Sequence, residues 1–199
     1  MQTEPEFRQS TSQQRHDKGD ISSATVAFQL SGLLTALVGS AFSSGVIYGL
    51  LEFLQRSPIR QEHIPGSAAW GQHLALALAT ATFLSVAQWR RRRRFGPHSG
   101  RRWLLAPLGR HAERRVARAF GFGSEAAQPG RALLALPAVA LFLFCSWRAG
   151  IQVIGGLDPN FTVNAWGGPS YVGAMACHYL DLFLVAAGAA WLIDRILPA

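Results

Sequence analysis

Hydrophobic residues gather into four long runs that charged side chains leave almost untouched. The last run is interrupted only by Asp158 and Asp181, and the other three hold no Lys, Arg, Asp or Glu. Because a helix rises about 1.5 Å per residue, each run can supply the roughly 20 residues that cross an apolar bilayer core. A soluble protein of this length cannot bury four fully apolar helices. The runs are 21–51, 64–89, 132–147 and 149–193.

This pattern predicts an all-α integral membrane protein with about four transmembrane helices, all within one domain, 23–199. The polar segment 1–22 is expected to be a disordered cytoplasmic tail, because it holds too few apolar residues to form a packed core. It has no basic region before a short apolar stretch, so it does not resemble a secretory signal peptide. The expected spans are about 25–51, 68–89, 132–154 and 171–193, with a basic cytoplasmic loop at 90–131 and an external loop at 155–170.

The composition agrees with the membrane class and indicates a bacterial source. Charged residues make up 15% of the chain, whereas an average soluble domain has about 25%. Lys18 is the only lysine among the basic residues, and Gly and Ala are abundant, which is typical of a GC-rich bacterial coding sequence. We therefore expect a multi-pass protein of a bacterial plasma membrane.

Arginine is concentrated between the second and third runs, where eleven arginines in residues 90–118 are accompanied by one acid, Glu113. Loops with such an excess of positive charge stay in the cytoplasm. Both termini are then cytoplasmic as well. The net charge of +8 needs no nucleic acid partner, because no base-reading module accompanies it. Anionic lipid headgroups are the expected partners of Arg90, Arg91, Arg92, Arg93, Arg94, Arg110, Arg114 and Arg118.

The end of the basic loop has the pattern of an amphipathic helix lying in the cytoplasmic interface. Pro107 is well placed to open a helix that runs to Phe120. Apolar residues recur there at helical spacing opposite the arginines, so the apolar side is expected to insert beneath the lipid headgroups. These apolar residues are Leu108, Ala112, Val116, Ala119 and Phe120.

Small residues recur at spacing four in the first run, including Ala41, Gly45 and Gly49. In lipid, such ladders let two helix backbones approach closely. We expect this side of the first span to pack against another helix, and ordinary packing within the chain is favoured over a dedicated dimer contact.

Four ionisable residues fall inside the predicted spans: His73, Arg148, His178 and Asp181. Such residues are costly in a bilayer and are candidates for function. Counted from the span ends they share the outer half of the membrane, so they are predicted to form a polar cluster. The favoured interpretation is an Arg148–Asp181 ion pair that fixes helix register. A proton or substrate pathway through His178 and Asp181 is the alternative.

No cofactor or metal is expected, although His73 and His178 lie at depths compatible with axial ligation of a haem. The chain has no nucleophile elbow, zinc-protease motif, phosphate-binding loop or Cys-x-x-Cys pair. The favoured function is therefore a non-enzymatic accessory or scaffold subunit that packs with lipid, with a membrane protein partner or with itself. The alternative is a transporter or a proton-coupled redox component that uses His178 and Asp181.

Overall fold

The computed structural model describes residues 29–95, 103–122 and 127–197, and the regular elements within these residues are all helices. The predicted tail at 1–22 lies outside the described residues. The elements, in chain order, are the α-helices α2 (Gly32–Leu54) and α3 (Trp70–Phe95), the 3₁₀ helix η2 (Trp103–Leu108), and the α-helices α4 (Arg110–Ala119), α5 (Pro129–Gly155), α6 (Pro159–Thr162) and α7 (Tyr171–Ile196).

Three of these helices, α2, α5 and α7, are long and apolar enough to cross a membrane. The fold therefore confirms the all-α class and supports the membrane class. Helix α3 occupies the position of the second predicted span, 68–89, but it is more polar than the other three. It carries Gln72 and His73 in its first turn and Arg90–Arg94 in its last turns.

Two predicted boundaries are wrong. The first helix begins at Gly32 rather than near residue 25, because the Ser31 side chain accepts a hydrogen bond from Leu34 N at 2.9 Å and caps the helix. Ser31 N also donates to Leu108 O at 2.8 Å, which holds the chain before α2 in an extended conformation. At the other boundary, α3 continues to Phe95, so the run of arginines after Trp89 lies in a helix and not in a loop.

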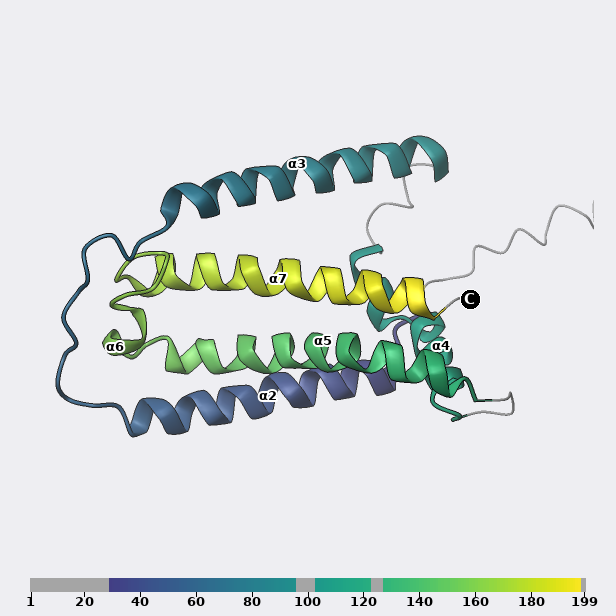
Figure 1. The fold of residues 1–199 in the computed structure, drawn as a ribbon, viewed down its shortest axis with the longest axis horizontal. Helices are drawn as coiled ribbons and strands as arrows, with labels where there is room; N and C mark the ends of the chain where they lie inside the picture. The colour runs from purple at the N-terminus through teal and green to yellow at the C-terminus, as the bar shows by residue number, and fades with distance from the viewer. Residues whose placement is uncertain (1–28, 96–102, 123–126, 198–199) are drawn as a thin grey trace, which may run out of the picture.

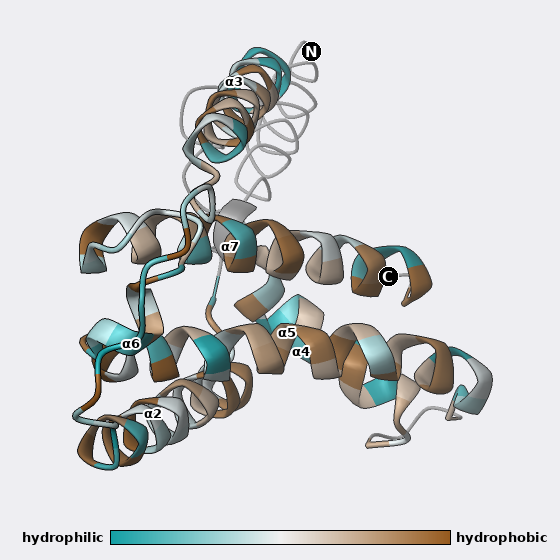
Figure 2. Cartoon of the chain, turned by 60° about the vertical axis from the view of Figure 1, so that its left-hand side comes forward, coloured by the Kyte–Doolittle hydropathy of each residue, from teal (hydrophilic) through white to brown (hydrophobic). Residues whose placement is uncertain are grey.

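The four long helices form an open row in the order α2, α5, α7 and α3, as Figures 1 and 2 show from two directions. Helix α6 and the two loops 55–69 and 156–170 lie at one end of the row, called the α6 end below. Helix α4 lies at the opposite end, the α4 end. An open row leaves two broad faces uncovered, and apolar side chains such as Leu133, Phe83 and Val172 are exposed on it.

The closest helix contact joins α2 and α5 and depends on glycine. A Cβ atom on Gly45 would overlap the carbonyl oxygen of Trp147, and one on Gly49 would overlap that of Ile151. On the other helix, a Cβ atom on Gly150 would overlap the carbonyl oxygen of Phe42. The predicted ladder therefore lies at a contact within the chain, with Ala41 half-buried beside it.

Helix α4 is amphipathic, but its apolar side packs on the protein. Ala119 is buried with Ala132 and Ala135 of α5 and with Leu197, and Val116 and Phe120 pack against the same cluster. The expectation that Ala112, Val116 and Phe120 insert beneath lipid headgroups is therefore wrong, because α5 and α7 cover this side. Pro107 lies in η2, outside α4. Arg115 fastens α4 to the end of α7 by an ion pair with Asp194 and a hydrogen bond to Leu197 O at 3.0 Å.

Candidate functional site

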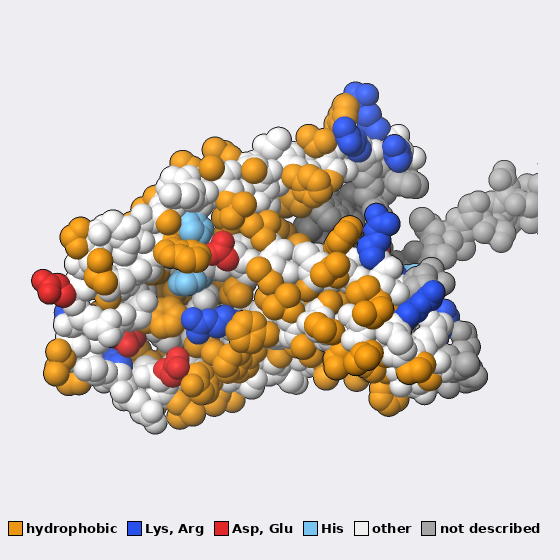
Figure 3. All heavy atoms as spheres, viewed as in Figure 1, with side chains coloured by type: hydrophobic (Ala, Val, Ile, Leu, Met, Phe, Trp, Pro, Cys, Tyr) orange, Lys and Arg blue, Asp and Glu red, His pale blue; other side chains and the backbone are white. Residues whose placement is uncertain are grey.

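The four ionisable residues that the sequence places inside spans come from three helices and lie toward the α6 end. His73 lies in the first turn of α3, Arg148 near the end of α5, and His178 and Asp181 one turn apart on α7. We call these four residues the polar centre. In Figure 3, histidine, acidic and basic side chains gather in this part of the viewed face, amid hydrophobic side chains.

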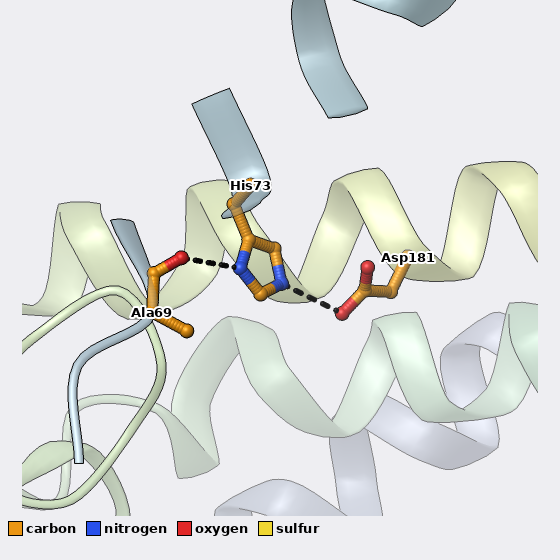
Figure 4. Close-up of polar contacts among 3 residues, drawn as sticks. All are labelled: Ala69, His73 and Asp181. Carbon is orange, nitrogen blue, oxygen red and sulfur yellow. Dashed lines mark hydrogen bonds and ion pairs between the residues drawn. The ribbon is translucent and has the colours of Figure 1, made fainter. Parts of the chain in front are cut away.

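His73 and Asp181 contact each other across α3 and α7, with 3.3 Å between Nε2 and Oδ2 (Figure 4). The other ring nitrogen of His73, Nδ1, lies 2.9 Å from Ala69 O. A carbonyl oxygen can only accept, so Nδ1 carries a proton. A hydrogen bond between Nε2 and Oδ2 then requires a second proton, held either by the imidazole or by the carboxyl group. The pair is therefore built to hold one proton between an imidazole and a carboxylate.

Aromatic side chains and a loop hold His73 in place. Its ring centroid lies 5.4 Å from that of Trp166, and its side chain is only 10% exposed. Ala69 N donates to Trp166 O at 2.7 Å, which ties the start of α3 to the loop before α7. A Cβ atom on Gly173 would collide with the Trp70 ring, so the first turns of α3 and α7 also pack tightly.

The predicted Arg148–Asp181 ion pair is absent from the described part of the chain. The Arg148 guanidinium lies instead over the Phe161 ring, with its carbon 5.4 Å from the ring centroid. Phe161 belongs to α6, so Arg148 extends toward the α6 end and away from the deeper Asp181. Long basic side chains extend in this way because the apolar stem stays buried while the charge moves toward water.

His178 is half-buried and close to every other member of the polar centre. Its ring lies 6.1 Å from that of Phe161, the same ring over which the Arg148 guanidinium lies. Among the described residues, the His178 imidazole has no hydrogen-bond partner. The structure thus brings the four predicted residues into one region, with one direct contact, between His73 and Asp181.

The polar centre lies on an open face of the helix row. The Asp181 side chain is 30% exposed, and Arg148 and His178 are both partly exposed. On α5, Arg148 lies one turn beyond Phe144, which is 50% exposed. On α7, Val185 lies two turns beyond His178 and is 42% exposed. These spacings place Phe144 and Arg148 on one side of α5, and His178 and Val185 on one side of α7.

The geometry argues against haem ligation by His73 and His178. Both nitrogens of His73 are already engaged, one by Ala69 O and the other by Asp181. An axial ligand needs a free imidazole nitrogen. The described ranges also hold no group of three His, Cys, Asp or Glu side chains that could bind a metal ion.

Two asparagines outside the predicted site residues hold the α6 end together. Asn160 Oδ1 accepts from Gln61 N at 2.8 Å, and its Nδ2 donates to Ile59 O at 2.9 Å. Asn164 Oδ1 accepts from Ile64 N at 2.8 Å. The side chains thus bind the loop 55–69 as a neighbouring strand would. In the sequence, this role is indicated by two asparagines that lie four residues apart in a polar loop.

The arginines predicted to contact lipid lie toward the α4 end, as the blue side chains in Figure 3 illustrate. Arg110 and Arg114 are exposed on α4, whereas Arg118 is half-buried. Arg93 stacks on Trp89 and Arg195 on Trp191, with guanidinium carbons 4.1 and 5.5 Å from the ring centroids.

No protein-family model, curated protein or solved structure matches the chain.

Proposed function

We propose that α3 is a fourth transmembrane helix beside the three that are apolar enough to span a membrane. Trp70 and Trp89 mark its two ends, and Trp is enriched at membrane interfaces. Roughly 29 Å of helix separates these two residues at 1.5 Å per residue, which matches the thickness of an apolar bilayer core. The side of α3 that is turned away from α7 is lined by exposed apolar residues, including Leu74, Leu78 and Phe83.

The α6 end then lies outside the cell and the α4 end in the cytoplasm of a bacterium. Arginines of α3 and α4 gather at the α4 end, and the positive-inside rule assigns that end to the cytoplasm. Both termini follow on the same side. Exposed arginines there, such as Arg92, Arg110 and Arg114, are suited to bind anionic lipid headgroups.

The function that this geometry supports best is that of a non-enzymatic accessory or scaffold subunit, whose polar centre packs against another protein within the membrane. The observation that carries this proposal is the exposure of Arg148, His178 and Asp181 on an open helix face. Polar groups at membrane depth are costly when lipid tails cover them, whereas polar groups of another protein lower that cost.

Photo-crosslinking within the membrane tests this proposal. A photoreactive phenylalanine analogue at Val185 lies on the face of the polar centre, and one at Phe183 lies on the other open face of α7. Their exposures, 42% and 40%, make them a matched pair. We expect a protein adduct from position 185 and lipid adducts from position 183. Lipid adducts alone from position 185 would show that no protein covers the polar centre.

The His73–Asp181 contact favours a second candidate function, a proton relay in a transporter or in a redox component. The pair holds one proton, and His178 lies one turn away from Asp181 on the same helix. A relay requires proton-dependent transport or turnover in proteoliposomes. Asp181→Asn should abolish this activity without lowering thermal stability. The scaffold function requires no such activity.

A further inference from the structure

Two members of the polar centre have unused hydrogen-bonding groups. The Arg148 guanidinium contacts only the Phe161 ring among the described residues, so its five N–H donors have no acceptor there. Asp181 uses Oδ2 toward His73, and Oδ1 has no partner within the described ranges. A strong donor and a strong acceptor thus share one open face without meeting within the chain.

Their depths match. Arg148 and His178 both lie about 10 Å from the α6 end of their helices, and Asp181 lies one turn deeper, at 1.5 Å per residue. A twofold axis parallel to the membrane normal keeps every residue at its own depth. If the axis passes between α5 and α7, it places α5 of one copy over α7 of the other. Arg148 of each copy then lies across from His178 and Asp181 of the second copy.

We propose that a second copy of this chain is the protein that covers the polar centre. The proposal rests on the scaffold function, which requires a protein on this face. In the symmetric dimer each Arg148 donates to Asp181 of the other copy, while Asp181 Oδ2 stays with His73. The charge complementarity is reciprocal, so the Arg148–Asp181 pair forms twice across one dimer contact, once from each chain.

The rest of the same face fits a helix–helix contact. Below the polar centre, α5 exposes Leu141 and Phe144, and α7 exposes Val185 and Leu192, each between 40 and 50%. These side chains supply apolar packing toward the α4 end, and the ion pairs select the partner. Lipid could cover the apolar part equally well, so the specificity comes from Arg148 and Asp181.

Disulfide crosslinking in native membranes tests this dimer. In two co-expressed, differently tagged copies, Leu141→Cys in one and Val185→Cys in the other should form a disulfide-linked dimer, because these residues share one depth on α5 and α7. The matched combination of Leu141→Cys with Phe183→Cys should not. The two natural cysteines, Cys145 and Cys177, are only 4 and 3% exposed, so the unmodified chain is the background. Adding Arg148→Gln to both copies should reduce the dimer crosslinked between residues 141 and 185 about tenfold, because Asp181 of each copy loses its partner. Arg148→Lys should retain most of it, and Arg56→Gln, at the exposed end of the loop, should have no effect.

Two differently tagged copies distinguish self-association from other partners. Recovery of both tags in the photo-adduct from Val185 supports the dimer. An adduct with a different protein overturns the dimer and leaves the scaffold function standing, whereas lipid adducts alone overturn both. If Arg148→Gln lowers thermal stability, Arg148→Lys, which keeps the charge, is compared instead. Crosslinking that is unchanged in Arg148→Gln contradicts a role for this charge. Loss of crosslinking in a stable Arg148→Lys variant contradicts it as well.

Discussion

His73 of α3 and Asp181 of α7 join the two helices by a direct side-chain contact, with 3.3 Å between Nε2 and Oδ2. The two side chains are 10 and 30% exposed, so the contact lies in a largely dry environment. Around it, α3 packs mainly against α7, and most of its described residues are exposed. Because most of α3 is exposed, this contact contributes to how firmly the helix is attached to α7.

We expect His73→Leu to loosen α3 and to lower the free energy of unfolding by about 1.5–3 kcal/mol, the range for a hydrogen bond in which one partner is charged. Spin labels at the exposed positions Ala81 and Ala187 would report a broader distance distribution between α3 and α7. Asp181→Asn should have a smaller effect than Asp181→Leu, since the amide oxygen still accepts a hydrogen bond. Glu52→Gln, which removes an exposed carboxylate, is the control. Unchanged distances in His73→Leu would contradict this role of the contact.

Gly150→Ala should force α2 and α5 apart. Its Cβ atom would overlap the carbonyl oxygen of Phe42, which is backbone and cannot move without shifting the helix. We expect a loss of about 1–3 kcal/mol in thermal or chemical unfolding in mild detergent, the usual cost of overpacking. The matched change is Gly39→Ala on α2, where no atom lies within 4 Å of the new Cβ. That variant should be as stable as the natural chain or more stable by about 0.5–1 kcal/mol, because alanine favours the helix. Equal effects of the two substitutions would mean that the close contact is unimportant.

Asn160→Ala should free the loop 55–69, because three backbone groups of that loop lose their partner in the Asn160 side chain. We predict faster cleavage after Arg60 by trypsin added to the outside of spheroplasts, with fragments identified by mass spectrometry. Asn160→Asp should have an intermediate effect, since it keeps the acceptor for Gln61 N and loses the two donor bonds. Gln55→Ala is a control, because it lies in the same loop and its side chain takes no part in these bonds. A cleavage rate that is the same in all variants would show that the asparagine does not hold the loop.

Cysteines placed at the two ends of the row should react from opposite sides of the membrane. Glu62 lies in the loop at the α6 end and Ala127 beside α5 at the α4 end, and both are exposed. An impermeant maleimide added outside intact cells should label Glu62→Cys and should reach Ala127→Cys only after lysis. Labelling of both residues from the same side would show that α3 does not cross the membrane. Labelling of Ala127→Cys alone in intact cells would reverse the orientation.

Segregation of apolar and charged residues along the chain was sufficient to predict the membrane class and the three helices α2, α5 and α7. A run of about 20 uncharged, largely apolar residues has few other stable conformations, since a bilayer core admits helices whose backbone groups are satisfied internally. The same reasoning placed Arg148, His178 and Asp181 at related depths, because rise per residue converts position into depth. The sequence alone also contains the ladder that includes Gly45 and Gly49.

The tertiary structure decided which groups meet. Depth says nothing about direction around a helix axis, so residue counting paired Asp181 with Arg148, whereas the orientation of α7 turns this carboxylate toward His73. The periodicity of α4 likewise predicts an apolar side without saying what covers it, and α5 and α7 cover it instead of lipid. The clasp of Asn160 on the loop 55–69 joins segments about 100 residues apart in the chain. Such contacts depend on how the helices are placed beside one another, which local sequence patterns do not specify.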